Sequence, residues 1–309
     1  MTFARVWFAA IVTAAVLHLA GCDANATDGG TLTTNLDPVS NLEAYSASVT
    51  SVGLVWTPSP AARTADMQDH QVRVLSVPAG TLLTTFTVAK TESSFVVTGL
   101  TGGTKYQFDV IVRPTSAATG KGNSSNASVI WSPARRLPTE AGGFPIKVFE
   151  TASPSFPSGL IIFKGTAPLA TSVQNPSPLS DTLLLDLYLK TETSSMVLLR
   201  SAHQYTGRVL PRITRFSSVT RNAASLNDPA VAPPDTTTYS SGNTSFSIDN
   251  SSIATSKILF FKANDGNYGR LLVKRQSNGT LIGGTSPDRF LELEVSYQTT
   301  PYNPYSRRR

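Results

Sequence analysis

Two carboxylates near the C-terminal end of the chain have a spacing that could serve catalysis. Glu292 and Glu294 alternate along a run that is typical of a β-strand, so their side chains face the same side about 7 Å apart. A glycosidase could use such a pair. However, Leu291, Leu293 and Val295 fill the other face, which is the pattern of any half-buried strand. We therefore interpret the two glutamates as surface residues.

Other patterns that could support chemistry are short or incomplete. Asn264-Asp265-Gly266-Asn267 offers oxygen ligands for calcium, but Asp-Gly between two strands is the commonest hairpin signal, and we interpret the segment as a turn. His18 lies in the N-terminal apolar stretch, while His70 and His203 are far apart, so a zinc site is not expected. Neither a Gly-x-Ser-x-Gly motif nor a P-loop occurs. The sequence thus predicts no catalytic residue, no metal and no cofactor.

The most distinctive charge feature is the stretch 193–227, which contains no acidic residue. Arginine can hold phosphate or uronate groups through paired hydrogen bonds. Arg208 and Arg212 are four residues apart in a predicted strand, 208–216, so they share a face and form the candidate anion-binding pair. Alternatively, acids from elsewhere in the fold neutralise these arginines. The stretch contains five of them: Arg200, Arg208, Arg212, Arg215 and Arg221.

The only cysteine, Cys22, follows a segment that indicates export. Arg5 precedes a long apolar run, which is typical of a secretory signal and too short for a comfortable membrane span. Leu19-Ala20-Gly21-Cys22 resembles the lipobox of bacterial lipoproteins. The resemblance implies that a signal peptide, residues 1–21, is cut between Gly21 and Cys22 and that Cys22 carries acyl chains such as palmitate. An ordinary signal peptide or an N-terminal transmembrane anchor are the alternatives.

Composition agrees with an anchored, exported β-protein. Residues 22–36 are small and polar, which is typical of a flexible tether. Only 15% of the residues are charged, and the net charge is +6, which favours attraction to anionic surfaces. The last nine residues, 301–309, end in three arginines and are predicted to form a basic tail. No nucleic-acid partner is expected.

Seven short β-branched or aromatic runs lie between residues 37 and 139, separated by turn residues. Such spacing predicts a β-sandwich. The segment resembles a fibronectin type III domain, because Trp56-Thr57-Pro58 and the stretch 100–110 match the two hallmarks of that family. The resemblance implies a tyrosine corner at Tyr106 and a binding or spacer role. The core residues that it implies are Trp56, Leu100, Tyr106 and Phe108. Gly102-Gly103 stands where the family often has proline, so we expect a looser turn there.

After a predicted linker, 140–143, residues 144–300 contain further short strands separated by Pro-, Ser- and Asn-rich loops. This pattern predicts a second β-sandwich, with a jelly roll as one arrangement that the spacing allows. Residues 258–274 loosely resemble a hairpin of extracytoplasmic lipoproteins of the Bacteroidetes–Chlorobi kind. The longest expected loop is 217–242. The expected strands are 160–164, 182–189, 196–200, 208–216, 245–248, 258–262, 268–274 and 290–297.

These observations predict an all-β, membrane-anchored protein of the cell envelope, on the outer membrane or the outer face of the inner membrane. The expected function is non-enzymatic, with the first unit as spacer or docking module and the second unit binding a protein or glycan partner. Two alternatives are a polysaccharide-acting hydrolase with an accessory fibronectin type III domain and a structural subunit of an envelope assembly.

Overall fold

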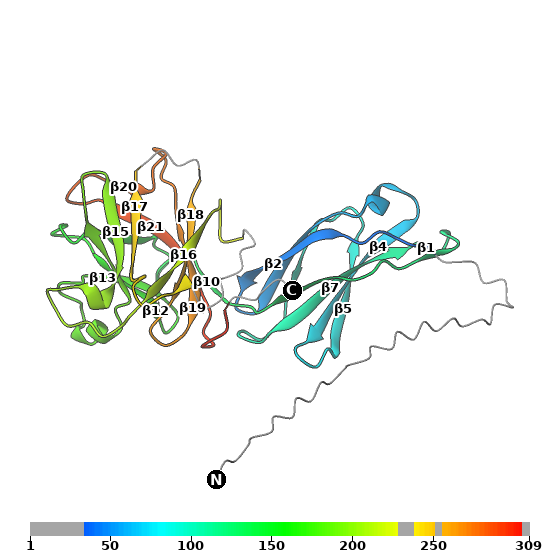
Figure 1. Ribbon diagram of the computed structural model, residues 1–309, viewed down its shortest axis with the longest axis horizontal. Helices are drawn as coiled ribbons and strands as arrows, with labels where there is room; N and C mark the ends of the chain where they lie inside the picture. The colour runs from blue at the N-terminus through cyan, green and yellow to red at the C-terminus, as the bar shows by residue number, and fades with distance from the viewer. Residues whose placement is uncertain (1–33, 228–237, 251–254, 305–309) are drawn as a thin grey trace, which may run out of the picture.

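The computed structural model describes residues 34–227, 238–250 and 255–304 (Figure 1). Cys22, the signal peptide, nearly all of the tether and Arg307–Arg309 lie outside the described residues. The chain folds into two β-sandwiches that follow one another along the long axis of the molecule. Among the described residues, no helix is long and apolar enough to cross a membrane. The all-β expectation is confirmed.

The first unit consists of two packed sheets. One has the order β2-β3-β6 and the other β5-β4-β7-β9, while β1 (Thr34–Asn35) pairs in parallel with β8 (Lys121–Gly122). A short 3-10 helix, η1 (Pro60–Arg63), precedes β4. The strands of the two sheets are β2 (Ser40–Ser48), β3 (Ser51–Thr57), β4 (Met67–Ser76), β5 (Leu82–Ala89), β6 (Ser94–Val97), β7 (Tyr106–Pro114) and β9 (Ala127–Trp131).

The residues predicted for the core of this unit are all buried. Trp56, Leu100, Tyr106 and Phe108 expose 8% or less of their surface. The Thr101 N–H donates a hydrogen bond of 3.0 Å to the Tyr106 hydroxyl, which fixes the turn before β7 as a tyrosine corner does. The period-two alternation of β7 explains the burial of Tyr106 and Phe108, because it places one row of apolar side chains between the sheets.

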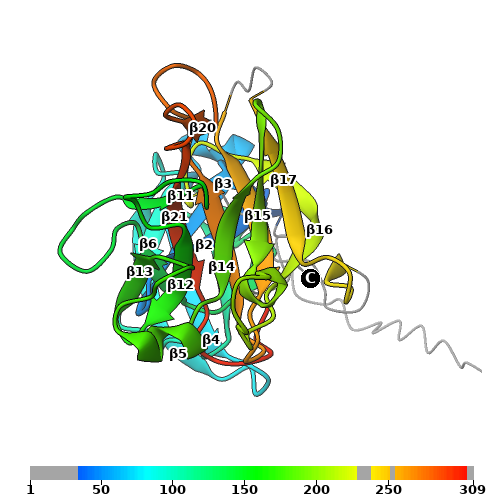
Figure 2. The ribbon, with the colours of Figure 1, turned by 90° about the vertical axis from the view of Figure 1, so that its left-hand side faces the viewer.

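The second unit is also a sandwich of two sheets. One sheet has the order β13-β12-β14-β15-β17, which can be followed from left to right in Figure 2. The other has β10-β21-β19-β18-β16, with β11 and β20 also paired to β21. Hairpins join β12 to β13, β14 to β15 and β18 to β19, while the chain crosses between the two sheets from β15 to β16, from β16 to β17 and from β17 to β18. Two more 3-10 helices, η2 (Leu179–Leu183) and η3 (Ala202–Gln204), lie between strands.

The strand bounds of the second unit are as follows. The first sheet contains β12 (Gly159–Lys164), β13 (Ala167–Thr171), β14 (Leu187–Thr191), β15 (Met196–Ser201) and β17 (Ser245–Asp249). The second sheet contains β10 (Arg135–Leu137), β11 (Ile146–Phe149), β16 (Arg215–Asn222), β18 (Lys257–Lys262), β19 (Tyr268–Val273), β20 (Ile282–Gly283) and β21 (Phe290–Tyr297).

Two of the strands expected in this unit differ from the structure. The expected strand 208–216 begins only at Arg215, and residues 182–186 precede β14 rather than belonging to it. Pro211 has no N–H to offer a sheet, and the N–H groups of Ile213 and Thr214 donate to side chains instead. Since β16 continues to Asn222, the first six residues of the loop expected at 217–242 belong to a strand, and residues 228–237 of that loop lie outside the described residues.

The connection between the two units lies earlier than expected. Residues 135–137 form β10, which pairs with β21, and Leu137 lies in the core of the second sandwich. The segment 140–143 is a turn inside the second unit, where the Glu140 carboxylate accepts the Ala170 N–H at 2.9 Å. The run Arg-Arg-Leu is too short and too polar to show in the sequence which sheet it joins.

Buried contacts fix the two units to each other. The Asn303 amide donates to the Gly103 carbonyl and to the Ser132 hydroxyl, both at 2.9 Å, and the Gln298 amide donates to the same hydroxyl at 3.2 Å. Gly103, at φ 78°, leaves no room for a Cβ beside Thr300. The glycine pair expected to loosen the turn therefore permits a close approach of the second unit.

An apolar cluster continues across the same junction. The outer face of the second sheet carries Ile258, Phe260, Tyr268 and Leu272, which are buried in one cluster with the core of the first unit. Trp131, at the end of β9, is also part of this cluster, and its indole N–H donates to the Ser46 hydroxyl at 3.0 Å. Because both polar and apolar contacts are buried, the junction is a packed interface rather than a flexible linker.

Candidate functional site

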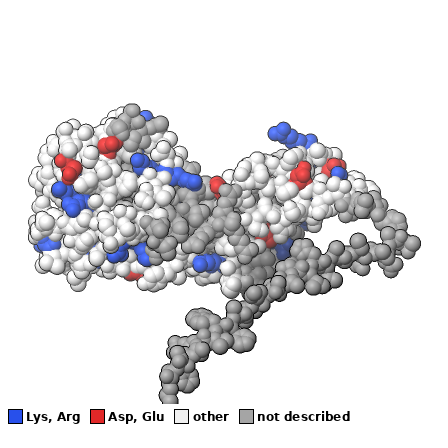
Figure 3. Space-filling model, in the orientation of Figure 1, with Lys and Arg blue, Asp and Glu red and all other residues white. Residues whose placement is uncertain are grey.

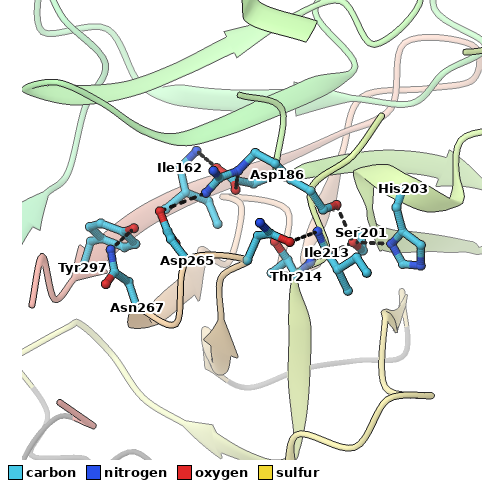
Figure 4. Close-up of polar contacts among 11 residues, drawn as sticks. Ile162, Asp186, Ser201, His203, Ile213, Thr214, Asp265, Asn267 and Tyr297 are labelled. Atoms are coloured by element: carbon cyan, nitrogen blue, oxygen red, sulfur yellow. Dashed lines mark hydrogen bonds and ion pairs between the residues drawn. The ribbon is translucent and has the colours of Figure 1, made fainter. Parts of the chain in front are cut away.

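A group of polar and charged side chains gathers around the turn between β18 and β19 in the second sandwich (Figure 4). Arg212 lies between two carboxylates: its Nε donates to Asp186 Oδ1 at 2.6 Å and its Nη2 to Asp265 Oδ2 at 3.3 Å. Asp186 precedes β14, Arg212 lies in the loop after η3, and Asp265 lies in the turn between β18 and β19. One guanidinium thus links three segments that are far apart in the sequence.

Asp186 is the buried member of this group. Its second carboxylate oxygen accepts the Ile162 N–H at 2.9 Å, and the residue exposes 2% of its surface. Burial raises the pKa of Asp186 from 3.8 to about 6, against the attraction of Arg212 and the Ile162 N–H, which lower it. Asp186 is therefore ionised at neutral pH and pairs with Arg212 in that state.

The hairpin turn supplies further polar groups. Asn264 Oδ1 accepts the Ile213 N–H at 3.1 Å, and the Asn267 amide donates to the Tyr297 hydroxyl at 2.6 Å. Burial raises the pKa of Tyr297 above its ordinary value, so its hydroxyl stays protonated. Asn267 Oδ1 is buried and has no hydrogen-bond partner among the described residues. The segment is a turn, as expected, and it also builds the polar group.

These side chains surround a pocket of about 200 Å³. Its polar lining comes from the end of β21, the turn between β18 and β19 and the loops before β14 and after η3, while Leu184 and Phe163 form an apolar wall. Phe163 is stacked on Tyr297 and has the Arg135 guanidinium over its ring. The pocket is lined by Phe163, Leu184, Asp186, Arg212, Asp265, Asn267, Tyr297 and Thr299.

Ser201 and His203 lie beside this group and have a structural role. The Ser201 hydroxyl is 2.8 Å from His203 Nδ1 and accepts the Thr214 N–H at 2.8 Å. Ser201 is completely buried, so no substrate reaches its oxygen. Burial and then the nearby charges of Arg215 and Arg200 lower the pKa of His203. The pair holds the loop after η3 against β15 and thereby positions Arg212.

The two arginines that the sequence predicts to act together have different partners. Arg208 lies outside β16 and donates to the Thr182 hydroxyl at 3.4 Å, while Arg212 is neutralised by Asp186 and Asp265. Because residues 208–214 do not form a strand, the expected common face does not exist. The alternative interpretation, in which acids from elsewhere in the fold neutralise an arginine, holds for Arg212.

The other charged features are also explained by local pairing. Glu292 and Glu294 face the same side, as expected, and both contact Lys274, at 2.8 and 3.7 Å. Figure 3 shows that lysine and arginine side chains on its face are spread in small groups over both units. Within residues 34–227, 238–250 and 255–304, no group of three or more His, Cys, Asp or Glu side chains could hold a metal ion.

Sequence patterns did not reveal most of the pocket. Asp186, Asn267 and Tyr297 are far apart in the chain, and each lies at the end of a strand or in a turn. The sequence signal that points to the pocket is Asn264-Asp265-Gly266-Asn267, a turn with more polar side chains than a hairpin requires. Which segment those side chains contact depends on the packing of the two sheets.

The fold and the site together define an all-β protein of two fused sandwiches. Its first unit, residues 37–131, is a fibronectin type III domain, since this segment matches the model of that family. None of the curated proteins matches the chain.

Single domains of solved structures are similar to part of the chain. The fn3 domain of the human collagen alpha-1(XX) chain is 24% identical, and the match covers 35% of this chain and 93% of that one, with a TM-score of 0.27. The FN5 domain of Drosophila Lar is 23% identical, with coverage of 32% and 97% and a TM-score of 0.24.

The pH dependence of stability tests the environment of Asp186. Between about pH 4 and pH 6 the folded chain binds a proton that the unfolded chain does not, so this carboxyl favours folding less as the pH rises. This rise in the pKa of Asp186 corresponds to a free energy of about 3 kcal/mol. Asp186→Asn removes the titration. We expect the free energy of unfolding of the wild type, relative to that of this variant, to fall between pH 4 and pH 7 in denaturant melts. A constant difference would contradict the assignment.

Proposed function

We propose that this chain is a lipid-anchored, non-enzymatic protein of a bacterial cell envelope, in which the fibronectin type III domain holds the second sandwich away from the membrane and the second sandwich binds a protein or glycan partner. The placement of the second unit carries this proposal. The chain enters the first unit at β1, at the end remote from the second unit (Figure 1). A tether that starts at Cys22 would therefore leave the second sandwich at the outer end.

The packed junction supports the role of the first unit as a rigid support. Asn303 and Gln298 of the second unit bond to Ser132, which is itself completely buried. A support of fixed geometry presents a binding surface in one orientation and lowers the entropy lost on binding. This favours a partner that the second sandwich meets at a defined distance from the membrane.

The anchor is proposed from the sequence. Leu19-Ala20-Gly21-Cys22 follows the apolar run, and Cys22 is the only thiol in the chain. Two or more acyl chains give stable anchoring, because each buried methylene contributes about 0.8 kcal/mol. The loose likeness of residues 258–274 to extracytoplasmic lipoproteins agrees with this location.

Cys22→Ser is predicted to leave an unprocessed or soluble protein, because the hydroxyl does not take the lipid that the thiol takes. Cell fractionation and intact mass of the two proteins measure this. A wild-type protein whose mass shows no acyl chains would refute the anchor.

The partner is tested by affinity capture from detergent-solubilised envelope with the full chain as bait. The proposal predicts one defined protein or glycan that is retained by the second sandwich. Recovery of a fixed set of envelope proteins in constant ratio would instead favour a structural subunit. No specific capture at all would contradict a binding role.

A further inference from the structure

The pocket beside Arg212 has hydrogen-bonding groups that the protein itself does not use. Arg212 donates from Nε and Nη2, and no described residue accepts from its Nη1. Asp265 accepts only at Oδ2, and Asn267 Oδ1 is buried without a partner within the described parts of the chain. A buried unsatisfied oxygen is rare in folded proteins and calls for an explanation. A ligand that donates to it would supply one.

The unused groups of the pocket include both hydrogen-bond donors and acceptors. Arg212 Nη1 and the protonated Tyr297 hydroxyl can donate, while Asp265 Oδ1 and Asn267 Oδ1 can accept. Each hydroxyl of a sugar both donates and accepts, so two neighbouring hydroxyls match such a set. A phosphodiester only accepts and an ammonium only donates, and either would leave part of the set unused.

The net charge of the pocket further limits the class of ligand that it can bind. Two carboxylates and one guanidinium give it a negative balance at neutral pH, which disfavours uronates and phosphates. The guanidinium at its centre disfavours a cation. The half-exposed Leu184 and the edge of Phe163 offer an apolar wall for the C–H side of a ring. The volume of about 200 Å³ suits one ring rather than an oligomer within the pocket.

We infer that this pocket binds a single neutral sugar residue, held by Arg212, Asp265 and Asn267 against Leu184. The inference rests on the proposed function and narrows its partner to a neutral glycan, free or attached to a protein. It replaces the anionic ligand expected from the arginine stretch.

The test uses the full chain in detergent micelles and saturation-transfer NMR with methyl glycosides of glucose, galactose, mannose and N-acetylglucosamine. Glucuronate, inorganic phosphate and ethanolamine serve as charged probes. We expect at least one neutral glycoside to bind at millimolar concentration and the charged probes to bind at least tenfold more weakly. Tighter binding of a charged probe, or no binding of any glycoside, would overturn the inference.

Two exposed positions make the test specific. Asp265→Asn removes the negative charge of one hydrogen-bond acceptor, at a turn residue whose side chain is 45% exposed. Leu184→Ala removes the apolar wall of the pocket. Both should weaken the glycoside about tenfold or more, whereas Glu192→Gln, an equal charge change at an exposed site, should not. Unchanged binding in both pocket variants would refute the site. If envelope capture succeeds while glycosides fail, only the sugar inference falls, and the proposed function stands.

Discussion

Replacing Arg289 with leucine is expected to lower the free energy of unfolding of the second sandwich by about 3–5 kcal/mol, because it leaves a buried carboxylate without its counter-charge. Glu150 is completely buried and Arg289 exposes 4% of its surface. The guanidinium donates to both carboxylate oxygens of Glu150, with Nη2 at 2.8 Å, and to the Ser194 carbonyl at 2.8 Å. The Thr191 hydroxyl also donates a hydrogen bond to Glu150 Oε2 at 2.6 Å.

A double replacement separates the ion pair from simple packing. Glu150→Met with Arg289→Met removes both charges and keeps apolar volume, and such exchanges are often neutral or stabilising. We therefore expect the double variant to be more stable than Arg289→Leu in denaturant melts. Equal losses in both variants would show that side-chain packing, and not the unpaired charge, controls stability at this position.

Trp56→Ala is expected to lower the free energy of unfolding of the fibronectin type III domain by about 3–5 kcal/mol, through lost burial and the cavity that remains. Trp56 exposes 3% of its surface and meets the edge of the His70 ring, with 5.2 Å between ring centroids. Denaturant melts of the full chain, followed by a probe in the first unit, measure this loss.

Trp56→Phe is the matched control. Its ring keeps most of the burial and removes an indole N–H that has no acceptor among the described residues. We expect a loss well below that of Trp56→Ala, since less volume is removed and a buried donor without a partner is eliminated. A loss as large as that of the alanine variant would mean that the indole makes a contact on which the core depends.

The first sandwich could be predicted closely from the sequence because its signals are local. Trp56-Thr57-Pro58 and the alternation that starts at Tyr106 identify strands and faces without reference to the rest of the chain. The predicted boundary at residue 139 lies too late, because the three residues of β10, Arg-Arg-Leu, carry no pattern that assigns them to either unit. Only its pairing with β21 assigns it to the second sandwich.

The candidate site depended on long-range packing and was therefore mostly hidden in the sequence. The strand predicted at 208–216 gave Arg208 and Arg212 a common face, but Pro211 and the side-chain bonds of the following N–H groups prevent a strand there. Asp186, which pairs with Arg212, lies 26 residues away in the chain. No spacing rule connects residues at such separations.

We expect the two sandwiches to tumble as one rigid body, with the second unit fixed at the end remote from the proposed anchor. Gly103→Val gives a comparison with a loosened junction, because a side chain there would occupy the space of Thr300. Amide nitrogen spin relaxation of the full chain measures the rotational correlation time of each unit. A rigid junction predicts one shared correlation time in the wild type and two in Gly103→Val. Two distinct correlation times in the wild type would contradict it.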